Sequence, residues 1–187
     1  MTRNRALLLD RDGVINRAIV REGRPCPPAS VDELEILPKV AEALARSRAA
    51  GFLNIVVSNQ PDVARGTQTR AAVEAMNREL KQSLPIDDLF VCYHDDADRC
   101  LCRKPLPGLI LQAAEKYDLD LSLCYVVGDR WRDIDAGSAA GCRTILIDYG
   151  YNERLPSRPP DFRAGSLSEA VARIEVEQRE CGVQTFF

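Results

Sequence analysis

The strongest constraint on this chain is an apolar run that ends in two carboxylates. Residues 6–9 are all apolar, and residues 10–13 then read Asp-Arg-Asp-Gly. A short apolar run bounded by a turn signal is typical of a buried strand, and ligands of open α/β sheets bind just beyond the carboxyl ends of such strands. Asp10 and Asp12 are therefore placed to hold a divalent cation and still leave one oxygen free to attack an electrophile. The alternative is an ordinary turn, which Asp and Gly both favour.

The rest of the chain alternates apolar runs with helical patterns. We expect buried strands at residues 53–57, 89–93, 124–127 and 144–147, and amphipathic helices at residues 40 to about 51, 73–84, 107–117 and 167–174. Strands that alternate with helices of this length predict an α/β fold with a doubly wound parallel sheet. The 187 residues, 45% of them hydrophobic, are enough for one well-buried core, so we expect a single domain over residues 1–187.

Two segments lack this periodicity. Residues 17–28 contain Arg17, Arg21, Arg24 and three prolines, which predicts a loop. Because this loop leaves the carboxylate-bearing strand end, it is either a substrate-contacting lid whose arginines meet a second anionic group, or a solvated basic loop. Residues 150–160 carry another three prolines and predict a surface connection before the last helix. The residues from Cys181 onward show no pattern that we can interpret.

Composition narrows the class of partner. A net charge of −3 without a long basic run argues against nucleic acid. No run of 18 apolar residues occurs, and the first residues lack the apolar region of a signal peptide, so we expect a cytoplasmic protein that does not bind a membrane. The expected partner is a small molecule. No large helical cap is visible between the polar strand ends, so we expect an open site and a monomer.

Polar side chains also follow two other predicted strands. Ser58 and Asn59 come after the strand at residues 53–57, and Asp129 and Asp133 come after the strand at residues 124–127. A hydroxyl and an amide at a strand end can donate hydrogen bonds to a phosphoryl oxygen, although Ser-Asn-Gln-Pro is also ordinary turn chemistry.

Four residues with metal-ligand spacing form the most specific local pattern. They are Cys92, His94, Cys100 and Cys102. Three thiolates and one imidazole predict a closed, structural zinc site, since metal binding is the commoner meaning of such spacing in a cytosolic chain. The alternatives are a redox pair or simply buried thiols. We expect Asp95, Asp96 and Asp98 inside this loop to be solvated.

Arg103 and Lys104 follow the last of these cysteines directly. A zinc loop would fix the backbone beside Lys104 and so preorganise its positive charge as a phosphate clamp. Together with the carboxylates and the hydroxyl, this lysine completes the parts of magnesium-dependent phosphoryl transfer through an aspartyl intermediate. The chain has no Gly-x-x-x-x-Gly-Lys-Ser/Thr motif, so a Walker-type nucleotide hydrolase is unsupported.

The three polar strand ends and Lys104-Pro105 match, in order along the chain, the four motifs of the haloacid dehalogenase (HAD) superfamily across residues 8–137. The chain resembles in particular its subfamily III, which holds heptose bisphosphate and histidinol-phosphate phosphatases, through Asp-Arg-Asp-Gly-Val-Ile-Asn, Ser-Asn-Gln, Ala-Arg-Gly, Cys-x-His and Cys-x-Cys-Arg-Lys-Pro. The resemblance implies a Rossmann-like HAD core without a large cap. It also implies a sugar bisphosphate as substrate, in the heptose route to lipopolysaccharide or another surface glycan.

The resemblance also implies roles for individual residues. Asp10 would be the nucleophile and Asp12 the general acid and base, while Ser58 and Lys104 would stabilise the transferring phosphoryl group. Mg²⁺ would be held by Asp10, the backbone carbonyl of Asp12, and Asp129, with Asp133 in support. Substrate contacts would come from Asn59, Arg65, Arg103 and Arg130.

The chain departs from the heptose enzymes in two segments. Residues 17–21 replace a segment that is usually acidic and contains His-Gly-Tyr, and Pro61 and Asp62 replace a pair of small residues. Both changes fall on expected substrate-contacting loops. Histidinol phosphate or another small phosphomonoester therefore stays open as the substrate. A catalytically silent, zinc-stabilised binding domain is the alternative from another functional class, although such a protein would be expected to have lost Asp10 or Asp12.

Overall fold

A parallel sheet forms the centre of the molecule, which we describe from a computed structural model covering residues 3–21 and 24–183. Within these residues the sheet has six strands in the order β5-β4-β1-β6-β7-β8, and every pairing is parallel. The strands are β1 (Ala6–Leu9), β4 (Leu53–Asn59), β5 (Asp88–Cys92), β6 (Tyr125–Gly128), β7 (Arg143–Ile147) and β8 (Phe162–Ala164). The predicted α/β fold class is thus confirmed.

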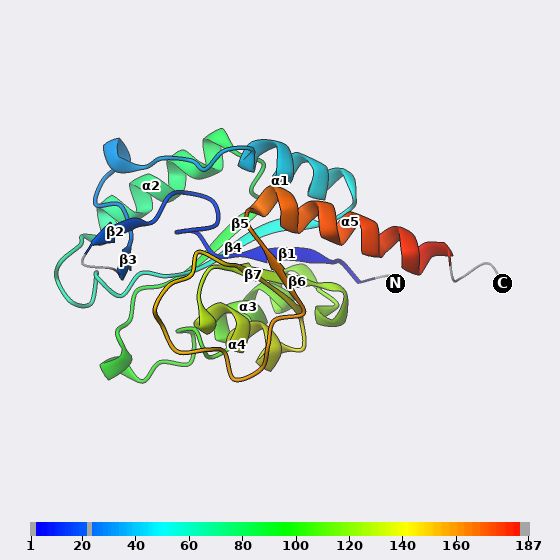
Figure 1. Cartoon of the computed structure of the whole chain (residues 1–187). Coiled ribbons are helices and arrows are strands. Elements are labelled where there is room, and N and C mark those ends of the chain that lie inside the picture. Colours follow the sequence, from blue (N-terminus) through cyan, green and yellow to red (C-terminus); the bar gives the residue numbers. More distant parts are fainter. Residues whose placement is uncertain (1–2, 22–23, 184–187) are drawn as a thin grey trace.

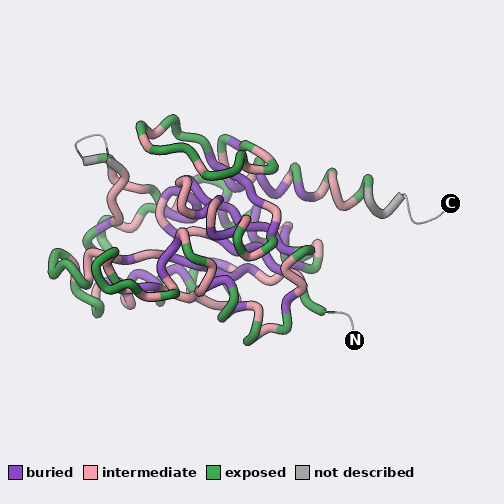
Figure 2. The backbone as a smooth tube through the Cα atoms, turned by 90° about the horizontal axis from the view of Figure 1, so that it is seen from below, coloured by how far each residue is buried: buried purple, intermediate pink, exposed green. Residues whose placement is uncertain are grey.

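Helices cover both faces of this sheet (Figure 1). One face carries α1 (Val40–Ala49), α2 (Arg70–Ser83) and α5 (Leu167–Val183), and the other carries α3 (Gly108–Tyr117) and α4 (Trp131–Ala140). Successive side chains of β1 point to opposite faces of the sheet. Leu7 and Leu9 belong to the core under α1 and α5, and Ala6 and Leu8 belong to the core under α3. Figure 2 shows that buried segments run through the middle of the molecule and that exposed segments lie at its margins.

The register of β1 determines where the polar strand ends meet. Leu9 pairs with Val56 of β4 on one side and with Val127 of β6 on the other. The residues at or just after the carboxyl ends of these strands therefore emerge at the same end of the sheet, next to each other. Asp10, Ser58 and Asp129 are brought together in this way, as expected for parallel strands that end in line.

The structure corrects the prediction for residues 17–28. This segment contains an antiparallel hairpin, β2 (Ile19–Arg21) and β3 (Arg24–Cys26), rather than a plain loop. Strands of three residues are too short to show a period of two in the sequence, and Pro25 in β3 further masks the pattern. The side chains of Arg21 and Arg24, like residues 184–187, lie outside what the structure describes.

Two elements of the second half were not predicted. Helix α4 begins directly after the acidic strand end, and β8 adds a parallel edge strand beside β7. The described residues also include three single turns of 3-10 helix: η1 (Val31–Glu33), η2 (Asp96–Asp98) and η3 (Leu121–Leu123). Among the described helices, none combines the length and the apolar character that a membrane span needs.

Candidate active site

A buried lysine joins two of the acidic strand ends. Lys104 Nζ donates to Oδ1 of Asp10 at 2.8 Å and lies 2.5 Å from Oδ1 of Asp133. Its third partner is the backbone carbonyl of Val57 at 2.7 Å. Each of the three ammonium protons thus has an oxygen partner, so one fixed positive charge lies at the carboxyl end of β1.

The backbone of Lys104 is held as firmly as its side chain. Asn59, the last residue of β4, accepts a hydrogen bond from Lys104 N at 3.0 Å and donates one to Lys104 O at 2.9 Å. This reciprocal pair ties the segment after the cysteine cluster to the end of a central strand. Asn59 therefore positions the lysine, besides lining the cleft described below.

Burial and charge act against each other at this pair. Burial raises the pKa of Asp10 to about 6, with further increases from Asp133 and Asp12, while the Lys104 ammonium lowers it. Burial lowers the pKa of Lys104, but the two neighbouring carboxylates outweigh this effect and leave the pKa raised. At neutral pH, Asp10 is accordingly an anion beside a fully charged lysine.

Asp129 is the acidic residue that most needs a further partner. Its side chain is buried, and neither carboxylate oxygen has a hydrogen-bond partner among the described residues. Burial, Asp10 and Asp133 together raise its pKa well above the ordinary value. The three carboxylates place ligand atoms within 4.8 Å of one another. Because two unpartnered buried carboxylate oxygens are costly, this donor set fits a hard divalent cation such as Mg²⁺.

Space around Asp129 depends on a glycine. Gly13 has a φ of +86°, and a Cβ added there would lie 2.0 Å from Oδ2 of Asp129. Only glycine meets both the backbone and the steric requirement. The Asp-x-Asp-Gly sequence after β1 therefore shapes the pocket for the acidic residue after β6.

The second carboxylate of the Asp-x-Asp pair is held by three side chains. Asp12 accepts hydrogen bonds from Arg11 at 3.0 Å to each oxygen, from Asn16 at 2.9 Å and from Gln60 at 2.7 Å. Gln60 also donates to Ser58 Oγ at 2.9 Å, so the buried serine is linked to Asp12. Our sequence analysis missed Arg11, Asn16 and Gln60 in this role, although all three lie within or beside the motifs.

The four carboxylates and the lysine of the site line a cleft of about 380 Å³: Asp10, Asp12, Asp129, Asp133 and Lys104. One wall comes from the hairpin segment and is mainly apolar, and it includes Ala18, Pro25 and Pro27. The other side carries the residues to which we assigned substrate contacts: Asn59, Arg65, Arg103 and Arg130. The segment that departs from the heptose enzymes at residues 61–62 lines the cleft as well.

Acidic residues of the cysteine loop pair with arginines of the cleft, so the expectation that they are merely solvated was wrong. Asp95 pairs with Arg65 at 2.7 Å, and Asp96 pairs with Arg103 at 2.8 Å. Arg132, which the sequence analysis did not single out, also lines the cleft and lies 3.4 Å from the same Asp96 oxygen. Asp95 lies 30 residues from Arg65 and Asp96 lies 36 residues from Arg132, so a local pattern contains no signal for these two pairs, whereas Asp96 and Arg103 are only seven residues apart.

Arg17 does not lie among the residues of the cleft wall. Its guanidinium forms a two-point pair with Glu35, at 2.7 and 2.9 Å. That pairing occupies the side chain on the exposed surface. Arg17 therefore does not make the contact with a second anionic group of a ligand that the lid prediction supposed.

Residues 150–160 do more than connect two elements at the surface. Glu153 forms a two-point pair with Arg130, the residue next to Asp129. Just before this segment, Tyr149 donates from its hydroxyl to Gly13 O at 2.9 Å, and further along Ser157 N donates to Asp135 of α4 at 2.7 Å. The segment is thus anchored on both sides of the acidic cluster, which its proline-rich composition did not indicate.

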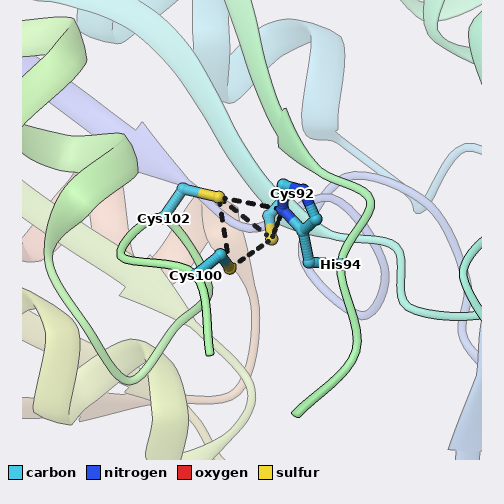
Figure 3. Close-up of side chains that lie close together, drawn as sticks. All are labelled: Cys92, His94, Cys100 and Cys102. Carbon is cyan, nitrogen blue, oxygen red and sulfur yellow. Dashed lines mark hydrogen bonds between the residues drawn. The ribbon is translucent and has the colours of Figure 1, made fainter. Parts of the chain in front are cut away.

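The four predicted metal ligands converge in space (Figure 3). The sulfur atoms of Cys92, Cys100 and Cys102 lie 3.3–3.7 Å apart, and Nδ1 of His94 lies 3.4 and 3.6 Å from two of them. These separations resemble the edges of a zinc tetrahedron, about 3.8 Å when Zn–S is about 2.3 Å. They are too long for a disulfide, which requires about 2.05 Å. The donor set therefore fits a structural metal ion.

Comparisons with known proteins agree with this geometry. The family described as HAD-hydrolase-like matches residues 101–170. The D-glycero-β-D-manno-heptose-1,7-bisphosphate 7-phosphatase of Bordetella bronchiseptica is 36% identical over 152 residues, covering 77% of this chain and 80% of that protein. The D-glycero-D-manno-heptose-1,7-bisphosphate 7-phosphatase of Chlorobaculum tepidum is 34% identical over 188 residues, covering 89% and 92%.

Solved structures give the same result. The D,D-heptose 1,7-bisphosphate phosphatase of B. bronchiseptica, complexed with magnesium and phosphate, superposes with a TM-score of 0.78 at 32% identity. The match covers 93% of this chain and 99% of that one. A HAD-like phosphatase from Mesorhizobium loti, described as putative by its authors, has a TM-score of 0.74 at 30% identity over 93% and 87% of the two chains.

Proposed function

This chain belongs to the HAD-like hydrolases, in the same branch as the heptose-1,7-bisphosphate 7-phosphatases, and on that premise we propose that it removes the 7-phosphate of D-glycero-D-manno-heptose 1,7-bisphosphate. The enzyme is then a phosphoric monoester hydrolase. Its whole length, residues 1–187, acts as one catalytic domain. It works in the cytoplasm as a monomer on a small phosphorylated metabolite.

One observation carries the proposal. Lys104 Nζ lies between Asp10 and Asp133, and beside them lies the Asp129 carboxylate, which finds no hydrogen-bond partner in the described part of the chain. A nucleophilic carboxylate, a fixed cation and a cation-binding carboxylate are the groups that phosphoryl transfer to an aspartate requires. An anionic nucleophile can approach an anionic phosphate only when such positive charge is in place.

The residues divide the reaction between them. Lys104 binds Oδ1 of Asp10, so Oδ2 is the oxygen that attacks phosphorus. As the bond from Oδ2 to phosphorus forms and the ester P–O bond breaks, Asp12 gives its proton to the leaving sugar oxygen. In the second half, Asp12 takes a proton from the attacking water as the water oxygen bonds to phosphorus. The bond from phosphorus to Oδ2 breaks, which releases inorganic phosphate and regenerates the Asp10 carboxylate. Arg11, Asn16 and Gln60 keep the Asp12 carboxylate in place for both steps.

Two metal ions are part of the proposal. Asp10, Asp129 and the backbone carbonyl of Asp12 would hold Mg²⁺, which when bound neutralises charge on the transferring phosphoryl group. A magnesium ion is present in the related B. bronchiseptica structure. Zn²⁺ in the cluster of Cys92, His94, Cys100 and Cys102 would have a structural role, because all four donors come from the protein and leave no open position.

The substrate is the part of the proposal that most needs a test. The names of the relatives include both the β anomer and the α anomer of the bisphosphate. We therefore propose to measure phosphate release with Mg²⁺ from both anomers, from histidinol phosphate and from a panel of sugar monophosphates. A strong preference for one anomer of the bisphosphate is the expected result.

The Asp10→Asn variant provides the blank for this assay. Preference for histidinol phosphate would replace the sugar bisphosphate by the alternative substrate within the same reaction class. Absence of phosphate release from every compound would instead favour the catalytically silent binding domain and contradict the proposed function.

A further inference from the structure

We propose that Asp96 is a built-in competitor for the second, non-reacting phosphate of the substrate, and so sets the affinity of the cleft for a bisphosphate. The proposal rests on the proposed function and adds a residue that takes no part in phosphoryl transfer. It concerns three side chains of the cleft wall: Asp96, Arg103 and Arg132.

A single carboxylate oxygen serves two arginines. Asp96 Oδ1 accepts a hydrogen bond from Nε of Arg103 at 2.8 Å and lies 3.4 Å from Nη1 of Arg132. Arg103 follows the cysteine cluster, whereas Arg132 belongs to the first turn of α4. Two guanidinium groups that converge on one oxygen from different elements form a site for an anion, and here the protein supplies the anion itself.

The two arginines are held from behind by the backbone. Arg103 donates to the carbonyl of His94 at 3.3 Å, and Arg132 donates to the carbonyl of Lys104 at 3.4 Å. The side chain of Arg103 is only 9% exposed. Arg132 makes a further contact, since its guanidinium lies over the ring of Trp131 at 4.6 Å. The cationic half of the arrangement is therefore fixed.

The acidic half is much less constrained. Asp96 lies on η2, a helical turn of only three residues, and its side chain is 57% exposed. Its carboxylate can turn into solvent without itself becoming a buried charge, and an incoming phosphate would then take its place beside the arginines. This asymmetry identifies Asp96 as the partner that an incoming phosphate would displace.

Displacement of Asp96 is required for the binding of a bisphosphate but not for the binding of a monophosphate. A substrate with one phosphate leaves the Asp96 pair closed, whereas the second phosphate of a bisphosphate must break it before the arginines become available. Asp96→Asn keeps an oxygen that accepts from Arg103 but removes the competing charge. Because a partly exposed charge pair of this kind is weak, the expected gain is about two- to fivefold in affinity.

The test compares heptose 1,7-bisphosphate with heptose 7-phosphate, which lacks the second phosphate. In Asp96→Asn we expect a KM for the bisphosphate about two- to fivefold lower, with an unchanged kcat and an unchanged KM for the monophosphate. A structural role for Asp96 predicts the opposite, a higher KM, because the arginines would lose their orientation. A raised or unchanged KM overturns the proposal.

Asp98→Asn is the matched control. It removes the same charge from the same turn, but Asp98 caps the backbone N–H of Asp95 and pairs with no arginine of the described chain. An equal effect of both substitutions would show a general change in charge and would overturn the specific role of Asp96.

Binding to the Asp10→Asn background separates this inference from the proposed function. Calorimetry measures the affinity of heptose 1,7-bisphosphate with and without Asp96→Asn, and it needs no turnover. Tighter binding in the double variant supports the inference even if the wild-type chain releases no phosphate. Equal binding, or no measurable binding to either variant, overturns it.

Discussion

Lys104 and Asp10 form a buried ion pair with Nζ and Oδ1 2.8 Å apart. The pair joins the residue that directly follows β1 to a residue that lies two positions after Cys102 of the cysteine cluster. Asp133 on α4 closes the pair from the other side. The position of the proposed nucleophile thus depends on three separate parts of the chain.

Replacing Asp10 by Asn should abolish turnover and leave the fold intact. The amide keeps the shape of the side chain but is a poor nucleophile, so we expect kcat to fall by at least about a thousandfold. Phosphate release and thermal unfolding of the same preparation check the two halves of the prediction. Substantial residual activity would remove Asp10 from the role of nucleophile.

Replacing Gly13 by Ala should displace Asp129 and weaken Mg²⁺ binding. The new Cβ would lie 2.0 Å from the Asp129 carboxylate, and the backbone would in addition be strained at a φ of +86°. Gly141→Ala is the control, because that glycine has a φ of +81° and no atom within 4 Å of an added Cβ. Strain alone should cost about 1–2 kcal/mol of stability in both variants.

The Mg²⁺ concentration needed for half-maximal activity distinguishes the two glycine variants. We expect it to rise several-fold in Gly13→Ala only. An equal, small effect in both would mean that the close approach of Gly13 to Asp129 is unimportant for the metal site.

Replacing Cys100 by Ser should remove zinc and destabilise the fold, since structural zinc contributes directly to folding free energy. We expect about one zinc per wild-type chain, far less in the variant, and a lower melting temperature for the variant. Cys142→Ala is the control, because this buried thiol lies outside the cluster and should lose packing but keep zinc. Full zinc content together with an unchanged melting temperature in Cys100→Ser would contradict a structural site.

The contact between α1 and α5 should be sensitive to acid. Arg46 donates to both oxygens of Glu175, and this hydrogen bonding lowers the pKa of Glu175 below its ordinary value of 4.5. A carboxyl whose folded pKa is lowered stabilises the fold fully above its unfolded pKa and loses that contribution as the pH falls through the folded value. Glu175→Gln should therefore cost about 0.5–1 kcal/mol at pH 7 and progressively less below pH 4.5.

Denaturant unfolding at a series of pH values measures this difference. Glu115→Gln on the exposed side of α3 is the matched control, because it removes one carboxylate from a helix surface without breaking the Arg46–Glu175 pair. A cost for Glu175→Gln that stays constant down to pH 3 would exclude the ion pair as its source.

The local patterns of the sequence were reliable where one element carries all the information. The β1 strand, the spacing of Cys92, His94, Cys100 and Cys102, and the order of the polar strand ends led to the fold and to most residues that now line one cleft. Period, spacing and turn chemistry act over a few residues, and they remain visible without a structure.

The hairpin of residues 19–26 was missed for the opposite reason. Its strands have three residues each, and they are stabilised by their pairing with each other rather than by an apolar pattern of their own. The same holds for β8, which has three residues and pairs with β7 across an intervening loop.

The sequence by itself determined the parallel sheet apart from its edge strand β8, the cysteine cluster, and which acidic and basic residues we assign to phosphoryl transfer. Only the tertiary structure decided how those groups are paired: Lys104 with Asp10 and Asp133, Gln60 with Asp12, Asp96 with Arg103, and Glu153 with Arg130. The physical reason is that periodicity records which face of an element is buried, whereas a charge pair depends on the positions of two elements that only the folded chain brings together.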